Sequence, residues 1–165
     1  MQFLKSLMLL ASLCLFSTPV VVDHDPAVPG PDNPYCGKTA SDFNPFVPTC
    51  PEGKTMNQAC LQGCKDTYKT AMVNAYNTAC TGYNDANTTY KMCAKLALQQ
   101  YDTCLLGAHN VAEREACRDT CLASIANCLN TLNNSRNTIA NNLANASANA
   151  SSTFAACALG CCESN

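Results

Sequence analysis

Three times the chain carries the pattern Ala-Cys-x-x-x-Cys, at Cys60/Cys64, Cys117/Cys121 and Cys157/Cys161, each within a stretch of helical pattern. Cysteines four residues apart on a helix share one face, with Cβ atoms about 5–6 Å apart and nearly parallel. A disulfide needs a Cβ separation of roughly 3.5–4.5 Å. Each pair is therefore expected to bond to cysteines of a facing helix, or to share a metal ion.

The first residues predict export. Lys5 precedes an apolar run from Leu7 to Phe16, followed by Ser17, Thr18 and Pro19. This order is typical of a secretory signal peptide, which we place at residues 1–18. The mature protein is then secreted, has no membrane span, and meets an oxidising compartment that favours disulfides. Removing Cys14 from the fourteen cysteines leaves an odd number, which predicts a free or modified thiol or a disulfide-linked homodimer.

The prolines divide the rest of the chain. All eight lie between Pro19 and Pro51, so residues 19–54 are predicted to be an irregular, Pro-rich extended arm. The arm carries Cys36 and Cys50, which can bond to each other or to the helical part. Residues 55–165 form a Cys-rich helical domain.

Helix punctuation predicts four helices in that domain. Thr55 and Asn110 read as N-caps, Gly82 and Gly107 as C-terminal glycines, and residues 133–137 as a turn. The expected helices are about 55–81, 84–107, 111–132 and 138–161. Apolar residues recur three and four positions apart in all of them. We expect an all-α fold, an up-down-up-down four-helix bundle stapled by disulfides.

The antiparallel register favours particular bridges. Cys93–Cys128 and Cys104–Cys117 both centre between residues 110 and 111, and Cys60–Cys161 and Cys64–Cys157 also share one midpoint. A competing set, Cys117–Cys161 with Cys121–Cys157, centres near Ile139, and the sequence alone leaves both open. The remaining candidates for disulfides are Cys36, Cys50, Cys80 and Cys162.

A metal site is the alternative use of the same sulfur atoms. The four-helix topology places seven cysteines at one end of the bundle, where they can bind Cu(I) or Zn. These residues are Cys60, Cys64, Cys104, Cys117, Cys121, Cys157 and Cys161. The arrangement resembles that of bacterial copper-storage proteins, four-helix bundles with cysteine-lined cores. Because export favours oxidation, we expect disulfides and no cofactor.

A third interpretation is an extracellular carrier of small apolar ligands, with a cavity lined by Tyr68, Tyr90, Tyr101 and Phe154. The order of six cysteines loosely resembles that of insect odorant-binding proteins, although the spacing between the last two is too long and seven other cysteines have no place in that pattern. These six are Cys36, Cys60, Cys64, Cys104, Cys117 and Cys128.

Charge and motifs exclude other classes. The net charge is −2 and there is no basic run, which argues against a nucleic-acid partner. The two histidines, His24 and His109, lie in the arm and in a turn, and no catalytic motif is present, so we expect no enzyme and no catalytic residue. Glycosylation sequons occur at Asn87, Asn133, Asn145 and Asn149. The preferred function is a secreted binding, interaction or structural module whose partner is an extracellular protein or small ligand.

Overall fold

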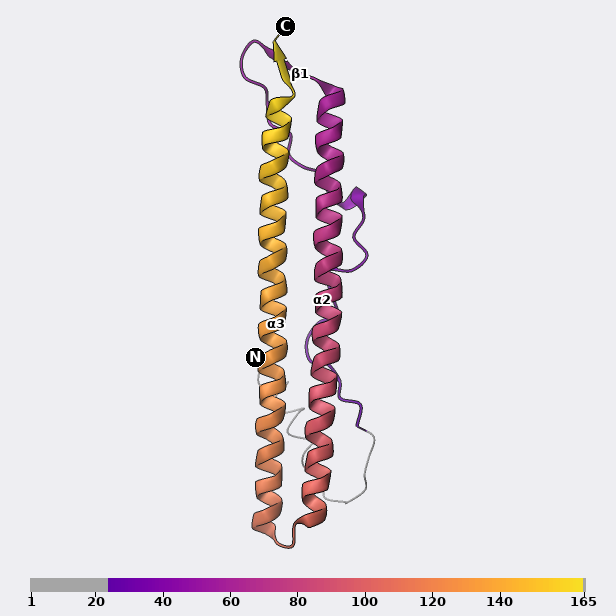
Figure 1. The fold of residues 1–165 in the computed structure, drawn as a ribbon, viewed down its shortest axis with the longest axis vertical. Coiled ribbons are helices and arrows are strands. Elements are labelled where there is room, and N and C mark those ends of the chain that lie inside the picture. The colour runs from indigo at the N-terminus through magenta and orange to yellow at the C-terminus, as the bar shows by residue number, and fades with distance from the viewer. Residues whose placement is uncertain (1–23, 165) are drawn as a thin grey trace. The chain divides into compact units, whose positions relative to one another are not determined.

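The computed structural model describes residues 24–164, so the expected signal peptide lies outside the described residues. Two long helices of 50 residues each dominate it, α2 (Gln58–Gly107) and α3 (Val111–Gly160), and they pack together (Figure 1). Before them come the short 3-10 helix η1 (Ala40–Asp42) and the strand β1 (Lys54–Met56), and after them the strand β2 (Cys162–Ser164). No described helix is long and apolar enough to cross a membrane.

The expectation of four helices is wrong, because both predicted breaks lie inside continuous helices. Gly82 is half-buried in α2, and a Cβ at this position would meet the Ile139 side chain at 3.4 Å. A helix-interior glycine is less favourable than alanine by about 1 kcal/mol, which is too little to end a helix that packs on both sides of it. In the predicted turn at 133–137, Arg136 donates hydrogen bonds from α3 to the Pro29 carbonyl and to Asn87.

The ends of the helices are capped by asparagines. Asn57 caps α2, because its side-chain Oδ1 accepts a hydrogen bond from the Cys60 backbone N–H at 3.1 Å. Thr55, the predicted cap, instead lies in β1. Asn110 caps α3 as predicted, accepting from the Glu113 N–H at 2.9 Å. The turn between the helices therefore begins after Gly107 and ends at Asn110.

The chain forms two compact units, which we call the tip unit and the base unit. The described residues of the tip unit are 24–32 and Asn84–Arg136, and those of the base unit are Asn33–Tyr83 and 137–164. Each unit contains a part of both helices, and in each the two helices run antiparallel and are joined by disulfides.

In the tip unit, large side chains fill the space between the helices. Tyr90, Leu98, Ile125 and Leu132 are each at most 2% exposed. The first described residues of the arm lie against this unit: His24 Nε2 is 2.8 Å from a carboxylate oxygen of Asp102 on α2. The arm is therefore held here by side-chain contacts, and His24 is not the solvated residue that its position in the arm suggests.

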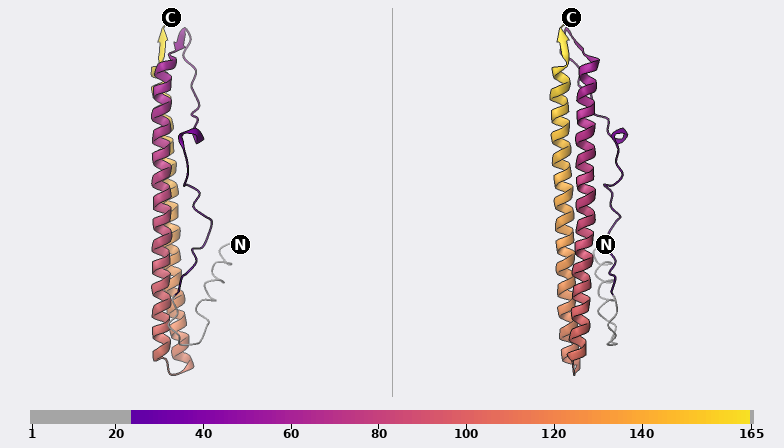
Figure 2. Two further views of the ribbon diagram at one scale, coloured as in Figure 1. Left: turned by 90° about the vertical axis from the view of Figure 1, so that its right-hand side faces the viewer. Right: turned by 45° about the vertical axis from the view of Figure 1, so that its right-hand side comes forward.

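In the base unit, the arm, α2 and α3 surround a second apolar cluster. It contains Leu61, Cys64, Phe154, Ala158 and Cys161. The arm runs beside the helices (Figure 2), and its Val47 packs against this cluster. Elsewhere in the unit the buried Phe43 of the arm contacts α2, with its ring centroid 5.1 Å from that of Tyr76.

A two-stranded antiparallel sheet closes the base unit. β1 pairs with β2, with Met56 opposite Cys162. The Asn57 backbone N–H also donates to the Cys161 carbonyl at 2.9 Å. The start of α2 and the end of α3 are thus joined by backbone hydrogen bonds, a pairing that no sequence pattern indicated.

Candidate functional site

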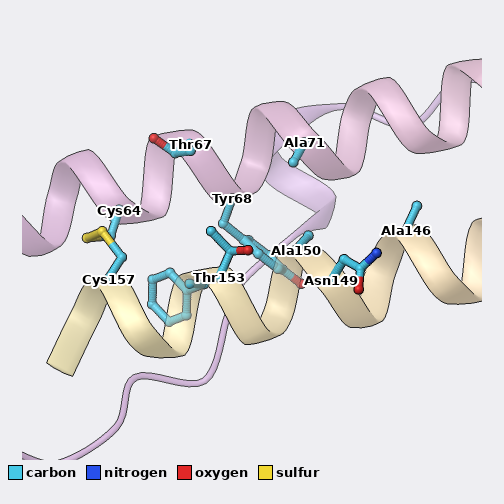
Figure 3. A pocket seen from close by; sticks show the side chains of 10 residues that line it. Cys64, Thr67, Tyr68, Ala71, Ala146, Asn149, Ala150, Thr153 and Cys157 are labelled. Atoms are coloured by element: carbon cyan, nitrogen blue, oxygen red, sulfur yellow. A yellow bond between two sulfur atoms is a disulfide. The ribbon is translucent and has the colours of Figure 1, made fainter. Parts of the chain in front are cut away.

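The base unit has a groove between α2 and α3. Two cavities of about 330 and 440 Å³ form it, and both are lined by Ala146. Figure 3 shows the residues of the first cavity. The first cavity is lined by Cys64, Thr67, Tyr68, Ala71, Ala146, Asn149, Ala150, Thr153, Phe154 and Cys157. The second is lined by Ala75, Thr78, Ala79, Gly82, Ile139, Asn142, Leu143 and Ala146. On α2 the lining spans Cys64 to Gly82, roughly 27 Å at the helical rise.

Small side chains create the groove. Where a helix pair normally fills its seam with Leu or Ile, this stretch presents Ala71 and Ala75 on α2 and Ala146 and Ala150 on α3. Alanines reach only a short distance from the helix axis, so they leave a channel between the two backbones. These alanines belong to the apolar residues that recur three and four positions apart, a spacing that predicts burial in the core. In the structure they are only half-buried or exposed.

The lining is uncharged and more apolar than its composition indicates. No Asp, Glu, Lys or Arg lines either cavity. The hydroxyls of Thr67 and Thr78 donate to the carbonyls of Gly63 and Asn74 in their own helix, at 2.9 and 3.0 Å. These two hydroxyls are therefore satisfied internally, and the amides of Asn142 and Asn149 are among the polar groups left at the groove, with the hydroxyls of Tyr68 and Thr153.

An aromatic pair and a disulfide form one end of the groove. The ring centroids of Tyr68 and Phe154 lie 5.6 Å apart, and the Cys64–Cys157 bridge, shown in Figure 3, lines the same cavity. The structure brings together only these two of the four aromatic residues predicted to line an apolar cavity. Tyr90 and Tyr101 belong to the tip unit, where they are buried in its core.

Six disulfides join described residues. Four are Cys60–Cys161, Cys64–Cys157, Cys93–Cys128 and Cys104–Cys117, the pairs favoured by the antiparallel register, and the competing set is absent among the described residues. All four are symmetric about the peptide bond between Asn110 and Val111. This single symmetry centre is the signature of one helical hairpin.

The other two bridges attach the arm to the helices. Cys36 bonds to Cys80 on α2, and Cys50 bonds to Cys162 in β2. Cys121 also takes part in a disulfide, so no cysteine in the described part of the chain is free. The odd thiol expected after removal of a signal peptide stays a prediction.

The seven candidate metal ligands are divided between the two units. Because neither helix breaks, Cys60, Cys64, Cys157 and Cys161 belong to the base unit, and Cys104, Cys117 and Cys121 belong to the tip unit. Within the base unit the sulfur atoms of Cys60, Cys64 and Cys161 all lie within 4.8 Å of one another. This cluster consists of two neighbouring disulfides.

The sequons lie along the helices. Asn87 and Asn133 are half-buried within α2 and α3, and the Asn87 side-chain oxygen accepts a hydrogen bond from Arg136 at 2.8 Å. Asn145 and Asn149 are exposed on α3. A glycan at Asn149 would stand at the groove, whereas Asn145 lines neither cavity.

Sequence reasoning missed the groove itself. The sequence signal for the groove is the large number of alanines at helical spacing in the parts of α2 and α3 that belong to the base unit. One contact between two helices cannot bury all of them. Comparisons with known protein families, with curated proteins and with solved structures found no match.

Proposed function

We propose that this protein is an extracellular, non-enzymatic binding module whose ligand is an elongated, uncharged apolar molecule held in the groove between α2 and α3. The observation that carries the proposal is the continuous, charge-free lining over both cavities. The two volumes fall within the roughly 300–1,000 Å³ of small-molecule sites, which are mostly apolar with a few polar groups. Asn142 and Asn149 supply such groups.

The disulfides support a binding role, because they fix the walls before a ligand arrives. Cys64–Cys157 joins the two walls at one end of the groove, with Cys60–Cys161 one helical turn beyond it. A preorganised site loses less conformational entropy on binding than a flexible one. A scaffold whose helices are covalently cross-linked can therefore keep an Ala-lined channel open that would otherwise narrow as the helices pack more closely.

The lining also indicates the class of ligand. A charged ligand would leave its charge uncompensated in this groove, since no ionisable group of opposite sign lines it. A length of roughly 27 Å suits an extended hydrocarbon chain more than a compact ring system. Tyr68 and Phe154 provide an apolar surface at the end next to the bridge.

The test uses two alanines of α3 that differ in their position relative to the groove. Ala146 lines both cavities, and Ala148, two residues further on, is exposed and lines neither. Binding of an uncharged naphthylamine dye, whose fluorescence rises in apolar surroundings, is measured for the oxidised wild type and for the variants Ala146→Phe and Ala148→Phe. We expect Ala146→Phe to raise the Kd at least ten-fold and Ala148→Phe to leave it unchanged.

Equal dye binding by all three proteins, or none by the wild type, would refute the proposal. Size-exclusion chromatography of the same samples separates the main rival occupant. If the wild type is a dimer and only Ala146→Phe is monomeric, the groove is an interface between two copies of the chain and not a ligand site.

A further inference from the structure

The two neighbouring disulfides of the base unit place four sulfur atoms close together. Cys60 bonds to Cys161, and Cys64 bonds to Cys157. Between the two bridges, Cys64 Sγ lies 3.7 Å from Cys161 Sγ. The Cys60 sulfur lies within 4.8 Å of both, and Cys157 is tied to the group through its bond to Cys64.

These spacings suit a tetrahedral thiolate site. With Zn–S bonds of about 2.3 Å, two sulfurs of a ZnS₄ tetrahedron lie roughly 3.8 Å apart. The contact between Cys64 and Cys161 already has this length. Breaking the two S–S bonds lets the bonded sulfurs separate to the same distance by side-chain rotation. Three of the cysteines are held on α2 and α3, and Cys161 directly follows the last residue of α3, where its backbone N–H donates to the Ala158 carbonyl at 3.1 Å.

We propose that Cys60, Cys64, Cys157 and Cys161 form a four-thiolate site for a thiophilic metal ion such as Zn²⁺ when both bridges are reduced, so that bridging and metal binding are alternative states of the same four sulfurs. A dithiol reductant supplies two electrons and two protons to each bridge and is itself oxidised to a disulfide. The metal ion then displaces the four thiol protons.

Features around the cluster support the reduced state. The first turn of α2 contains Cys60, whose backbone N–H is bound by the Asn57 cap, and the partial positive charge of a helix N-terminus favours a thiolate. The sheet and the hydrogen bond from the Asn57 backbone N–H to the Cys161 carbonyl hold the two helix ends together without any disulfide.

The tip unit provides the internal control. Its bridges Cys93–Cys128 and Cys104–Cys117 have the same antiparallel geometry, but they lie eleven residues apart on each helix, roughly 16 Å at the helical rise. The sulfurs of these two bridges therefore cannot share one ion with each other. The cluster in the base unit is the one group of metal-competent side chains found among the described residues.

The experiment measures binding of Co²⁺, whose visible absorption intensifies strongly in a tetrahedral thiolate site. The full chain is reduced anaerobically with a phosphine, which takes oxygen from water and leaves two thiols per bridge without competing for metal. Wild type, Cys64→Ser/Cys157→Ser and the control Cys93→Ser/Cys128→Ser are titrated with Co²⁺, and Zn²⁺ is then added to displace it.

We expect tetrahedral thiolate bands in the wild type and the control, and a loss of at least four-fifths of their intensity in Cys64→Ser/Cys157→Ser. Circular dichroism of the same reduced samples establishes that the helices remain. Bands of equal intensity in both double variants, or no bands in a helical wild type, would overturn the proposal. Because this test requires reduced protein and the dye test uses oxidised protein, either proposal can fail without the other.

Discussion

Removing a bridge from the base unit should destabilise the protein less than removing one from the tip unit, although the opposite follows from sequence separation. Cys60 and Cys161 are 101 residues apart, and Cys93 and Cys128 only 35. If each bridge were the only cross-link, loop-closure entropy would stabilise the folded state by about 4.7 kcal/mol for Cys60–Cys161 and by about 3.8 kcal/mol for Cys93–Cys128.

The bridges are nested, however, and each closes only the ring left open by its neighbours. With Cys64–Cys157 intact, Cys60–Cys161 closes a ring of about 8 residues, which corresponds to about 2.5 kcal/mol. With Cys104–Cys117 intact, Cys93–Cys128 closes a ring of about 22 residues, which corresponds to about 3.4 kcal/mol. The order of the two bridges is therefore reversed, with a difference of about 1 kcal/mol.

The two bridges are well matched for this comparison. Each joins one exposed cysteine to one buried cysteine, Cys161 being 1% and Cys128 2% exposed. Substitution by alanine therefore removes a similar amount of packing in both variants. The difference between their free energies of unfolding then reports the difference in loop-closure entropy. Urea unfolding of Cys60→Ala/Cys161→Ala and Cys93→Ala/Cys128→Ala under non-reducing conditions gives the two free energies of unfolding. A larger loss for Cys60→Ala/Cys161→Ala would refute the nested-ring argument.

Two further substitutions probe the helices. Gly82→Ala should raise the free energy of unfolding by about 0.5–1 kcal/mol, because alanine favours the helix. The added Cβ would meet only the flexible Ile139 side chain, at 3.4–3.5 Å. A loss of stability in thermal unfolding would show that this contact is too tight. Tyr90→Phe should leave stability unchanged or raise it by about 1 kcal/mol, since the buried Tyr90 hydroxyl has no hydrogen-bond partner among the described residues. Burial also raises the pKa of Tyr90, so above a pH of about 10 the tyrosine ionises first in the unfolded state. The wild type should therefore lose stability there more steeply than Tyr90→Phe. Parallel pH profiles of the two proteins in urea unfolding would contradict the raised pKa of Tyr90.

The cysteine register was the part of the fold most open to prediction from sequence. Four cysteine pairs share one symmetry centre at Asn110–Val111, and covalent geometry allows few ways to satisfy them. One continuous hairpin requires this regularity, because all positions along its two helices pair about the same turn. Gly82 and residues 133–137 indicate breaks through local preference alone, and packing between the two helices overrides that preference. The prediction of four helices is wrong for this reason.

Other features depended on contacts that leave no local pattern. The pairing of β1 with β2 joins segments of three residues each, too short for an alternation of apolar and polar residues to be read. The Cys36–Cys80 bridge joins an irregular arm to a helix, so no common register could indicate it. The groove was hidden because alanine at helical spacing reads equally well as core or as helix-favouring surface, and only the facing helix distinguishes the two.

The disulfides between the two helices determine what proteolytic cleavage of the turn would do. The turn at Ala108–Asn110 joins the helices, and His109 and Asn110 are exposed to a protease. Four bridges cross from α2 to α3, and a fifth ties the arm to β2. A nick at the turn would thus yield two peptides that remain one covalent molecule, with a mass increased only by one water, and they would separate only on reduction. For this protein, peptide-bond continuity and structural integrity are separate properties, and an active form isolated from its source can consist of two chains.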